Sequence, residues 1–245
     1  MKLPQGFVGA GCAAGLKSTG ALDLTLIENK GPSFFGTAVF TSNKVVAAPV
    51  IWSKQVVKDE IVRAVVLNSG GANACTGPQG FADTHATAEL VGELLEVSSG
   101  EVVVCSTGLI GELLPMAKIE SGIRSIASEL KSESLQECAQ AIMTTDSVPK
   151  IAQATLGKVQ VAGIAKGAGM LAPALATMLS VVMTDGLVGS NAAKIFAQVT
   201  DRTYNRIDSD GCTSTNDTVL FMASGASGQA LSDSELEDLL MKVCG

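Results

Sequence analysis

The sequence predicts an α/β or α+β protein in which helices cover the faces of β-sheets. Short apolar runs that are typical of strands alternate along the chain with segments of helical periodicity, and this alternation indicates layers of sheet and helix. Of the 245 residues, 47% are hydrophobic and 17% are charged, which is enough apolar material for a substantial core. The 26 glycines favour many tight turns between short elements.

Each expected strand is a short apolar run. From Leu22 to Leu26, leucines alternate with polar residues, which indicates a strand with one buried face. The continuous runs VRAVVL and EVVVC indicate strands that are covered on both faces. On these grounds strands are expected at residues 22–26, 36–41, 62–67, 101–105, 158–164, 178–183 and 218–222.

Four segments have the apolar spacing of helices. The clearest runs from Met116 to Leu130, where apolar residues recur every third or fourth position. The last segment begins with a capping box formed by Ser232 and Glu235. Helices are therefore expected at residues 86–95, 116–130, 192–204 and 232–243, while residues 132–136 give only a weak loop signal and no domain boundary.

Composition argues against several classes of protein. The net charge of −7 and the lack of a basic run argue against a nucleic-acid partner. The eighteen uncharged residues between Lys166 and Asp185 reach the lower length limit of a membrane span, but they contain glycines, a proline and hydroxyl groups. The N-terminus lacks the apolar core of a signal peptide, so we expect a soluble cytoplasmic protein without membrane contact.

The six cysteines and the single histidine limit the possible chemistry. The cysteines are widely spaced and form no CxxC pair, which favours reduced, packed thiols over disulfides or zinc. His85 lies on an expected helix and is interpreted as an ordinary surface or packing residue. A nucleophilic pair of Cys75 with His85 is the alternative. A single histidine excludes a histidine-rich metal site, and no metal is expected.

Three glycine-containing segments are candidate ligand loops. GAGCAAG, at residues 9–15, loosely resembles a dinucleotide-binding loop, but no clear strand precedes it, so turn glycines are favoured. NSGGANACTG and CSTGLIG each follow an expected strand. Glycine there lets backbone amides point at a ligand or an oxyanion, and purely structural turns are the alternative.

Thr177 is a candidate nucleophile, because an enzyme without a usable histidine can employ a threonine whose base is its own α-amine. That amine has a pKa of about 7.7–8.0 and becomes free only if the bond after Ala176 is cut. The threonine hydroxyl can cut this bond by attacking the preceding carbonyl. Pro173 disfavours a helix here, and the small Ala176 leaves room around its carbonyl. From the residues alone, a buried core threonine is the favoured alternative.

Several segments of the sequence resemble one family. KGAGMLAPALATMLSVVMTDG, around Thr177, is similar to the processing motif of the bifunctional ornithine acetyltransferase/glutamate N-acetyltransferase (ArgJ-type) family of arginine biosynthesis. The resemblance covers the whole chain, and the matching segments follow the family order: PQGFVGAGCAAGLK, VLNSGGANACTG, GFADTHATAE, VCSTGLIGELLPM, AIMTTDSVPK and DGCTSTNDTVL.

The resemblance implies a layered αββα sandwich of the N-terminal-nucleophile type, like that of DmpA and ornithine acetyltransferase. It implies self-cleavage between Ala176 and Thr177, so that residues 1–176 form an α chain and residues 177–245 begin a β chain. The implied assembly is an α2β2 heterotetramer. Later β-chain segments of the family find no counterpart here, so a chain truncated at its C-terminus is expected.

The resemblance also implies the roles of individual residues. Thr177 would be the nucleophile, Thr107 and Gly108 the oxyanion hole, and Thr144, Lys166 and Thr177 the substrate contacts. N-acetylornithine would acetylate Thr177, and glutamate would then take the acetyl group in a ping-pong reaction. Lys166 could hold a substrate carboxylate or lower the pKa of the Thr177 amine.

No cofactor is implied, although acetyl-CoA is a second acetyl donor in bifunctional members. Two alternatives stay open. An aminopeptidase or amidase of the same superfamily would pass the acyl group to water, and an inactive truncated fragment would be neither cleaved nor acetylated.

Overall fold

The computed structural model describes residues 1–169, 178–208 and 210–245. Nine strands are described: β1 (Phe7–Cys12), β2 (Leu24–Asn29), β3 (Phe35–Phe40), β4 (Ala64–Asn68), β5 (Val102–Ser106), β6 (Lys150–Leu156), β7 (Val159–Lys166), β8 (Leu179–Thr184) and β9 (Thr218–Ala223). Six α-helices are described with them: α1 (Ala48–Val56), α2 (Gly77–Leu95), α3 (Met116–Ala127), α4 (Leu135–Ala141), α5 (Ala192–Arg202) and α6 (Asp233–Cys244).

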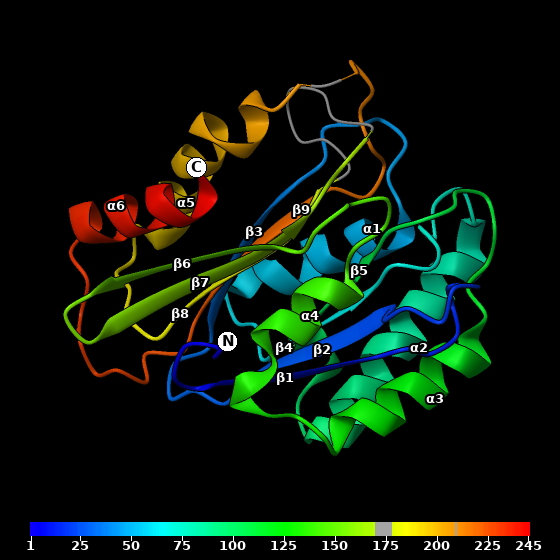
Figure 1. Cartoon of the computed structure of the whole chain (residues 1–245), viewed down its shortest axis with the longest axis horizontal. Helices are drawn as coiled ribbons and strands as arrows, with labels where there is room; N and C mark the ends of the chain where they lie inside the picture. Colours follow the sequence, from blue (N-terminus) through cyan, green and yellow to red (C-terminus); the bar gives the residue numbers. More distant parts are fainter. Residues whose placement is uncertain (170–177, 209) are drawn as a thin grey trace.

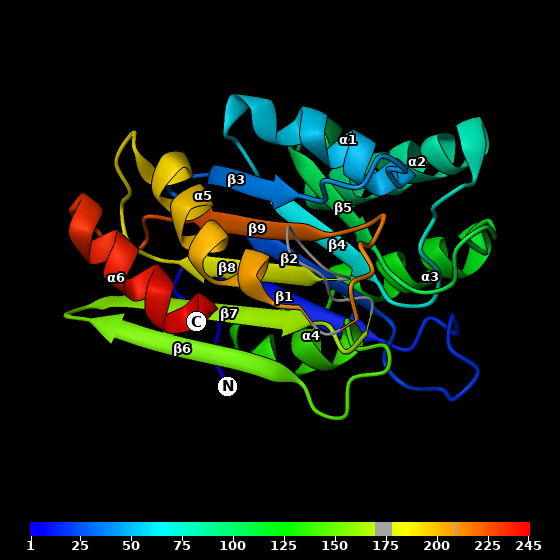
Figure 2. The same ribbon diagram turned by 90° about the horizontal axis from the view of Figure 1, so that it is seen from above.

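The strands form two mixed sheets. The first has the order β1-β2-β4-β5, in which β4 and β5 are parallel and the other neighbours are antiparallel. The second has the order β3-β9-β8-β7-β6, in which β9 and β8 are parallel and the other neighbours are antiparallel. Figures 1 and 2 show the two sheets between two groups of helices, α5 with α6 and α2 with α3.

The alternation of side chains along each strand divides the core into layers. Val181 and Met183 of β8 join Val65 and Leu67 of β4 in a cluster between the sheets. Val182 faces the opposite way and packs in the cluster under α5 and α6. A third cluster joins the outer face of the first sheet to α2 and α3. The expected layered αββα sandwich is therefore confirmed.

The predicted elements are confirmed with shifted ends. Every expected strand and helix is present, but α2 begins nine residues earlier than residue 86. Prediction missed β1, β6, α1 and α4. The weak loop signal at residues 132–136 was wrong, because this segment is a 3-10 turn at Ser132–Ser134 that leads into α4.

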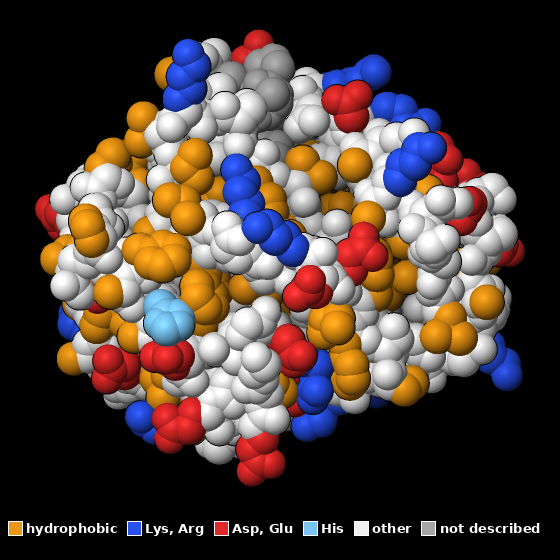
Figure 3. Space-filling view, turned by 180° about the vertical axis from the view of Figure 1, so that it is seen from behind, with side chains coloured by type: hydrophobic (Ala, Val, Ile, Leu, Met, Phe, Trp, Pro, Cys, Tyr) orange, Lys and Arg blue, Asp and Glu red, His pale blue; other side chains and the backbone are white. Residues whose placement is uncertain are grey.

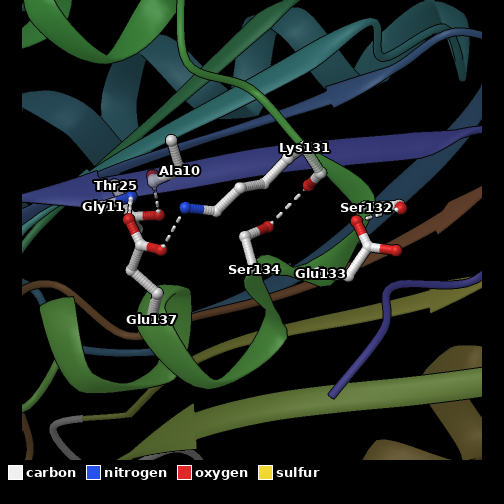
Figure 4. Close-up of polar contacts among 8 residues, drawn as sticks. All are labelled: Ala10, Gly11, Thr25, Lys131, Ser132, Glu133, Ser134 and Glu137. Carbon is white, nitrogen blue, oxygen red and sulfur yellow. Dashed lines mark hydrogen bonds and ion pairs between the residues drawn. The ribbon is translucent and has the colours of Figure 1, made fainter.

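The GAGCAAG segment is not a ligand loop, because its first half lies in β1. A Cβ atom on Gly9 would lie 3.0 Å from Cys138 Sγ, and one on Gly11 would lie 3.2 Å from the Glu137 carbonyl oxygen, so these glycines let α4 approach the strand. Figure 4 shows this contact, in which the Gly11 N–H donates to Glu137 Oε1 at 2.9 Å. The Glu137 carboxylate also pairs with Lys131 Nζ at 3.0 Å.

The strand expected from Leu22 to Leu26 does not have a polar, solvent-facing side. Asp23 and Thr25 are fully buried. The Asp23 carboxylate accepts three backbone N–H groups, those of Ala14, Leu16 and Lys17, at 2.7–3.0 Å. Thr25 Oγ1 donates to the Ala10 carbonyl at 2.7 Å. The alternation was therefore correct as a strand signal, but the polar residues satisfy buried backbone groups instead of meeting water.

The six cysteines are free thiols, as predicted, but the prediction that they are packed holds fully only for Cys105 and Cys138, whereas Cys75 and Cys212 are exposed. The histidine prediction agrees with the structure. His85 is nearly half exposed on α2, its ring lies 4.9 Å from that of Trp52, and its Nε2 lies 3.7 Å from Glu89. Figure 3 shows the histidine on the surface next to apolar side chains. Among the described residues, no helix is long and apolar enough to span a membrane, and no cluster of three metal-binding side chains is found.

Candidate active site

Strand ends from both sheets meet at one end of the molecule. In the first sheet, the parallel strands β4 and β5 end side by side. In the second, Lys166 at the end of β7 pairs with Leu179 at the start of β8, which pairs in turn with Thr218 at the start of β9. Asn216 Nδ2 donates to the Ser106 carbonyl at 2.8 Å and so joins the two sets of strand ends.

The two glycine-containing loops after β4 and β5 pack against each other. Gly71 and Thr107 form an antiparallel bridge, and the Thr107 N–H donates to the Asn68 carbonyl at 2.9 Å. Further along, the Gly111 N–H donates to the Ala74 carbonyl at 2.9 Å. NSGGANACTG and CSTGLIG thus form one backbone unit beside the strand ends.

Gly108 has a conformation and surroundings that only glycine suits. Its φ is +133°, and a Cβ atom there would lie 2.7 Å from the Gly71 nitrogen. Thr107, directly before it, is buried, whereas Gly108 is exposed. A backbone held this tightly is suited to presenting the Gly108 N–H to an oxyanion, whereas Thr107 would contribute its hydroxyl, because its N–H already donates to the Asn68 carbonyl.

Lys166 is a buried cation at this end of the second sheet. Its side chain is 1% exposed, and Nζ donates to Thr107 Oγ1 at 3.2 Å. Burial lowers the pKa of the Lys166 ammonium to about 8, while the carboxylates of Asp146 and Asp217 partly oppose this shift. The sequence-predicted residues Lys166 and Thr107, from different sheets, are therefore in direct contact.

Thr144 lies half-buried in the loop between α4 and β6, and Asp146 ties this loop to the site. The Thr144 N–H donates to Asp146 Oδ2 at 3.2 Å. Oδ1 of the same carboxylate accepts the Gly167 N–H at 2.8 Å and the ammonium of Lys150. Burial tends to raise the pKa of Asp146, but these hydrogen bonds outweigh it, so the pKa is lowered. Thr144 is thus linked to the residue directly after Lys166.

Asp217 is a buried carboxyl group at the start of β9. Its Oδ1 accepts the N–H of Met178, the residue that follows Thr177, at 2.8 Å. Burial raises the pKa of Asp217 to about 6, although hydrogen bonds and the charge of Lys166 act in the opposite direction. Its Oδ2 is buried and has no hydrogen-bond partner among the described residues.

The structure brings four of the six predicted site residues to one place. Thr107, Gly108, Thr144 and Lys166 are joined by the contacts given above. Ala176 and Thr177 lie outside the described residues. Met178, which follows Thr177 in the chain, is held beside the start of β9, since its carbonyl accepts the Thr218 N–H at 3.0 Å.

Sequence reasoning missed the positioning residues of this site. Asn216 and Asp217 lie in DGCTSTNDTVL, and Asp146 follows Thr144 in MTTD, but none had been given a role. A polar Asn-Asp pair directly before an apolar strand was a usable signal, because such residues cluster at strand ends that form sites. Their partners come from other strands, so the pairing itself was not visible in the sequence.

One known protein family matches almost the whole chain. The model of the ArgJ family matches residues 9–245. The chain belongs to the ArgJ family. The arginine biosynthesis bifunctional protein ArgJ of Streptomyces avermitilis is 53% identical over 98% of this chain, which spans 63% of that relative's length.

Solved structures agree with the fold. The ornithine acetyltransferase of Mycobacterium tuberculosis, solved in complex with ornithine, is 49% identical, with a TM-score of 0.63 over 69% of this chain and 92% of the solved chain. A β-aminopeptidase of Burkholderia is only 13% identical, yet it covers 98% of this chain and 81% of its own, with a TM-score of 0.62. The second likeness concerns the fold alone.

Proposed function

We propose that this ArgJ-family chain belongs to an acetyltransferase that moves an acetyl group from N-acetylornithine to glutamate. The observation that supports this most is the buried contact of Lys166 with Thr107, beside the strong backbone constraint at Gly108. A cation next to a candidate oxyanion hole suits a substrate that carries both a carboxylate and an acyl group. The relatives named for arginine biosynthesis and ornithine acetyl transfer support the same substrates.

In the proposed reaction Thr177 is the nucleophile. Its α-amine, once free, takes the hydroxyl proton as the oxygen attacks the acetyl carbonyl of N-acetylornithine. Thr107 and Gly108 stabilise the oxyanion that forms. Ornithine leaves with the proton, and the amine of glutamate attacks the acetyl-threonine in the second half-reaction. Lys166 and Thr144 hold the polar groups of the two amino acids.

The proposal includes self-cleavage after Ala176, and the lengths of related chains support it. The 241 residues aligned with the Streptomyces avermitilis protein are 63% of it, so that protein has about 380 residues. The segment that aligns with the solved Mycobacterium tuberculosis chain is 69% of this 245-residue chain and 92% of the solved chain. The solved chain therefore has about 184 residues. Such a chain, shorter than half of a full-length relative, is expected when the enzyme consists of two pieces. Cleavage after Ala176 would leave an α piece of similar size here.

The remaining features of the proposal are an α2β2 assembly of cleaved chains in the cytoplasm, no cofactor, and acetyl-CoA as a second acetyl donor. Residues 1–176 would form the α chain, and residues 177–245 would begin the β chain. Acetyl-CoA use is tested by replacing N-acetylornithine with acetyl-CoA in an assay of glutamate acetylation.

The deciding experiment is intact mass spectrometry of the protein with and without N-acetylornithine. The expected result is a break between Ala176 and Thr177, an acetyl group on the piece that begins with Thr177, and loss of both in Thr177→Ala. Repeated turnover of N-acetylornithine that requires glutamate identifies a transferase, whereas repeated turnover without glutamate identifies a hydrolase, because one equivalent of ornithine leaves in the first half-reaction in either case. An uncleaved chain that never carries an acetyl group would refute the proposed function.

A further inference from the structure

A single amide side chain links the two glycine-containing segments to the second sheet. Asn216 lies just before β9, and its Nδ2 donates to the Ala72 carbonyl at 2.6 Å and to the Ser106 carbonyl at 2.8 Å. Ala72 lies in NSGGANACTG and Ser106 in CSTGLIG. One side chain of the second sheet therefore holds a backbone carbonyl in each of the two segments.

The orientation of the Asn216 amide is fixed by its partners. Both neighbours of Nδ2 are carbonyl oxygens, which only accept hydrogen bonds, while Oδ1 accepts the Thr215 hydroxyl at 2.6 Å. A rotated amide would place Oδ1 against two carbonyl oxygens. Asn216 is 4% exposed, so a carbonyl that lost its donor there would stay unpaired at a high cost.

The contact with Ser106 fixes the peptide unit that directly precedes the Gly108 N–H. The Ser106 carbonyl and the Thr107 N–H belong to one planar peptide. Asn216 holds this carbonyl, and the N–H donates to the Asn68 carbonyl at 2.9 Å. Because both ends of the plane are held, from different sheets, the next N–H along the chain can turn only about the bonds of the Thr107 Cα atom.

The contact with Ala72 fixes the backbone that follows Gly108. The Ala72 carbonyl accepts Asn216, and the Ala72 N–H donates to the Leu109 carbonyl at 2.9 Å. Gly108 itself packs on Gly71 so closely that a Cβ atom would lie 2.7 Å from the Gly71 nitrogen. The Gly108 N–H is thus held between backbone stretches that Asn216 joins.

We propose that Asn216 is the positioning residue of the oxyanion hole, an inference that rests on the proposed function because it concerns the donors of that reaction. Its two N–H groups set the direction of the Gly108 N–H and keep Thr107 where Lys166 Nζ donates to its Oγ1 at 3.2 Å. The oxyanion develops only as the acyl carbonyl is attacked. A misdirected donor therefore lowers kcat and leaves substrate binding almost unchanged.

The test is Asn216→Asp in the protein made from its natural coding sequence. The variant keeps the size of the side chain and an acceptor for Thr215, but it places an oxygen where one nitrogen met two carbonyls. We expect kcat for acetyl transfer to fall by about 100-fold or more, the loss that follows removal of one oxyanion donor. The KM for glutamate should stay within about 3-fold of wild type.

Asn29→Asp is the matched control. Asn29 is also buried, and its Nδ2 donates to the carbonyls of Ser33 and Ala223 at 3.1 and 3.3 Å. Ala223 ends β9, so this pair of contacts lies at the opposite end of the strand from Asn216. The control should also lower the midpoint of thermal unfolding, but it should keep kcat within about 3-fold of wild type.

Hydrogen exchange measured by mass spectrometry reports on the two segments without an activity assay. The N–H groups of Ala72, Thr107 and Gly111 each donate to a carbonyl of the other segment. In Asn216→Asp these amides should exchange about 10-fold faster or more, whereas in Asn29→Asp they should exchange at the wild-type rate.

Four results would overturn the inference: a normal kcat in Asn216→Asp, an equal loss of kcat in Asn29→Asp, unchanged exchange of the three amides, or a rise in KM without a loss of kcat. If Asn216→Asp does not fold, Asn216→Ala decides by the same criteria, because it removes the donors without adding a charge. A wild-type protein that transfers no acetyl group refutes the proposed function instead, and the exchange rates then still test whether Asn216 holds the two segments.

Discussion

At the scale of single residues, the site depends on ionisable groups that are buried together. Lys166 is 1% exposed and Asp217 is fully buried, and each partly offsets the effect of burial on the pKa of the other. Removing an ionised group from water is costly unless a partner compensates. Lys166 is a buried cation at the strand ends that form the candidate site. It is therefore the residue that we expect to bind a substrate carboxylate.

Binding of that carboxylate should weaken above about pH 8, because Lys166 is charged below its pKa and neutral above it. Lys166→Met should raise the KM for glutamate by about 10- to 100-fold at neutral pH, since a hydrogen bond to a charged group contributes about 1.5–3 kcal/mol. The rise in KM of the wild-type enzyme with pH should be absent in the variant. Steady-state kinetics between about pH 7 and 9.5 measures this, and a flat wild-type KM would contradict it.

Asp146→Asn should destabilise the protein by about 1–3 kcal/mol, because the amide cannot accept hydrogen bonds through both of its terminal atoms. The pKa of Asp146 is lowered in the folded state, so its contribution to stability is present above the unfolded pKa of about 3.9 and is lost as the pH falls through the folded value. Urea unfolding measures the loss at neutral pH. Asp238→Asn, on the exposed face of α6, is the control and should be unchanged.

At the scale of elements, the two glycine loops act as one rigid unit because they exchange backbone hydrogen bonds. Gly108 and Gly111 both have positive φ, but only Gly108 lies against another backbone segment. The close approach of Gly108 to Gly71 therefore fixes the backbone beside Thr107, whereas Gly111 has open space where a Cβ would go.

This difference between the two glycines can be measured. Gly108→Ala should cost about 2–3 kcal/mol and most of the acetyl transfer, whereas Gly111→Ala, with strain but no collision, should cost about 1 kcal/mol and keep most activity. Thermal unfolding and kcat for the two variants provide the comparison. Equal losses in both variants would show that the packing of Gly108 on Gly71 is unimportant.

At the scale of the whole molecule, the proposed cleavage would break the chain between β7 and β8, two neighbouring strands of the second sheet. Both pieces would still contribute strands to that sheet. In the second sheet, β3, β6 and β7 belong to residues 1–176, while β8 and β9 belong to residues 177–245. β8 pairs with β7 and β9 pairs with β3, each over six residue pairs, so the two strands of the second piece lie between strands of the first. The apolar clusters on both faces of this sheet also contain residues of both pieces.

The two pieces should therefore remain together after cleavage. We expect them to co-elute in gel filtration in plain buffer and to separate only when a denaturant unfolds the sheet, because ladder hydrogen bonds and shared core bury both pieces in one unit. Native mass spectrometry of the cleaved protein provides a second measurement. Separation of the pieces in plain buffer would contradict the interleaved arrangement.

The sequence alone determined the elements whose apolar spacing is local. The 3.6-residue period of α3, the capping box of α6 and the continuous runs of β4 and β5 all lie within a few neighbouring residues, where steric preference and burial act directly. Their places in the chain, and the likeness of the Thr177 segment to its family, needed no knowledge of distant contacts.

Only the tertiary structure decided which residues meet. β6 is largely exposed and has no clear alternation, so only its pairing with β7 makes it a strand, and β1 contains glycines because α4 packs against it. The contacts of Lys166 with Thr107 and of Asp217 with Met178 join residues 59 and 39 positions apart. Such contacts, and the pKa shifts that burial causes, arise from the packing of two sheets, which local spacing along one chain does not encode.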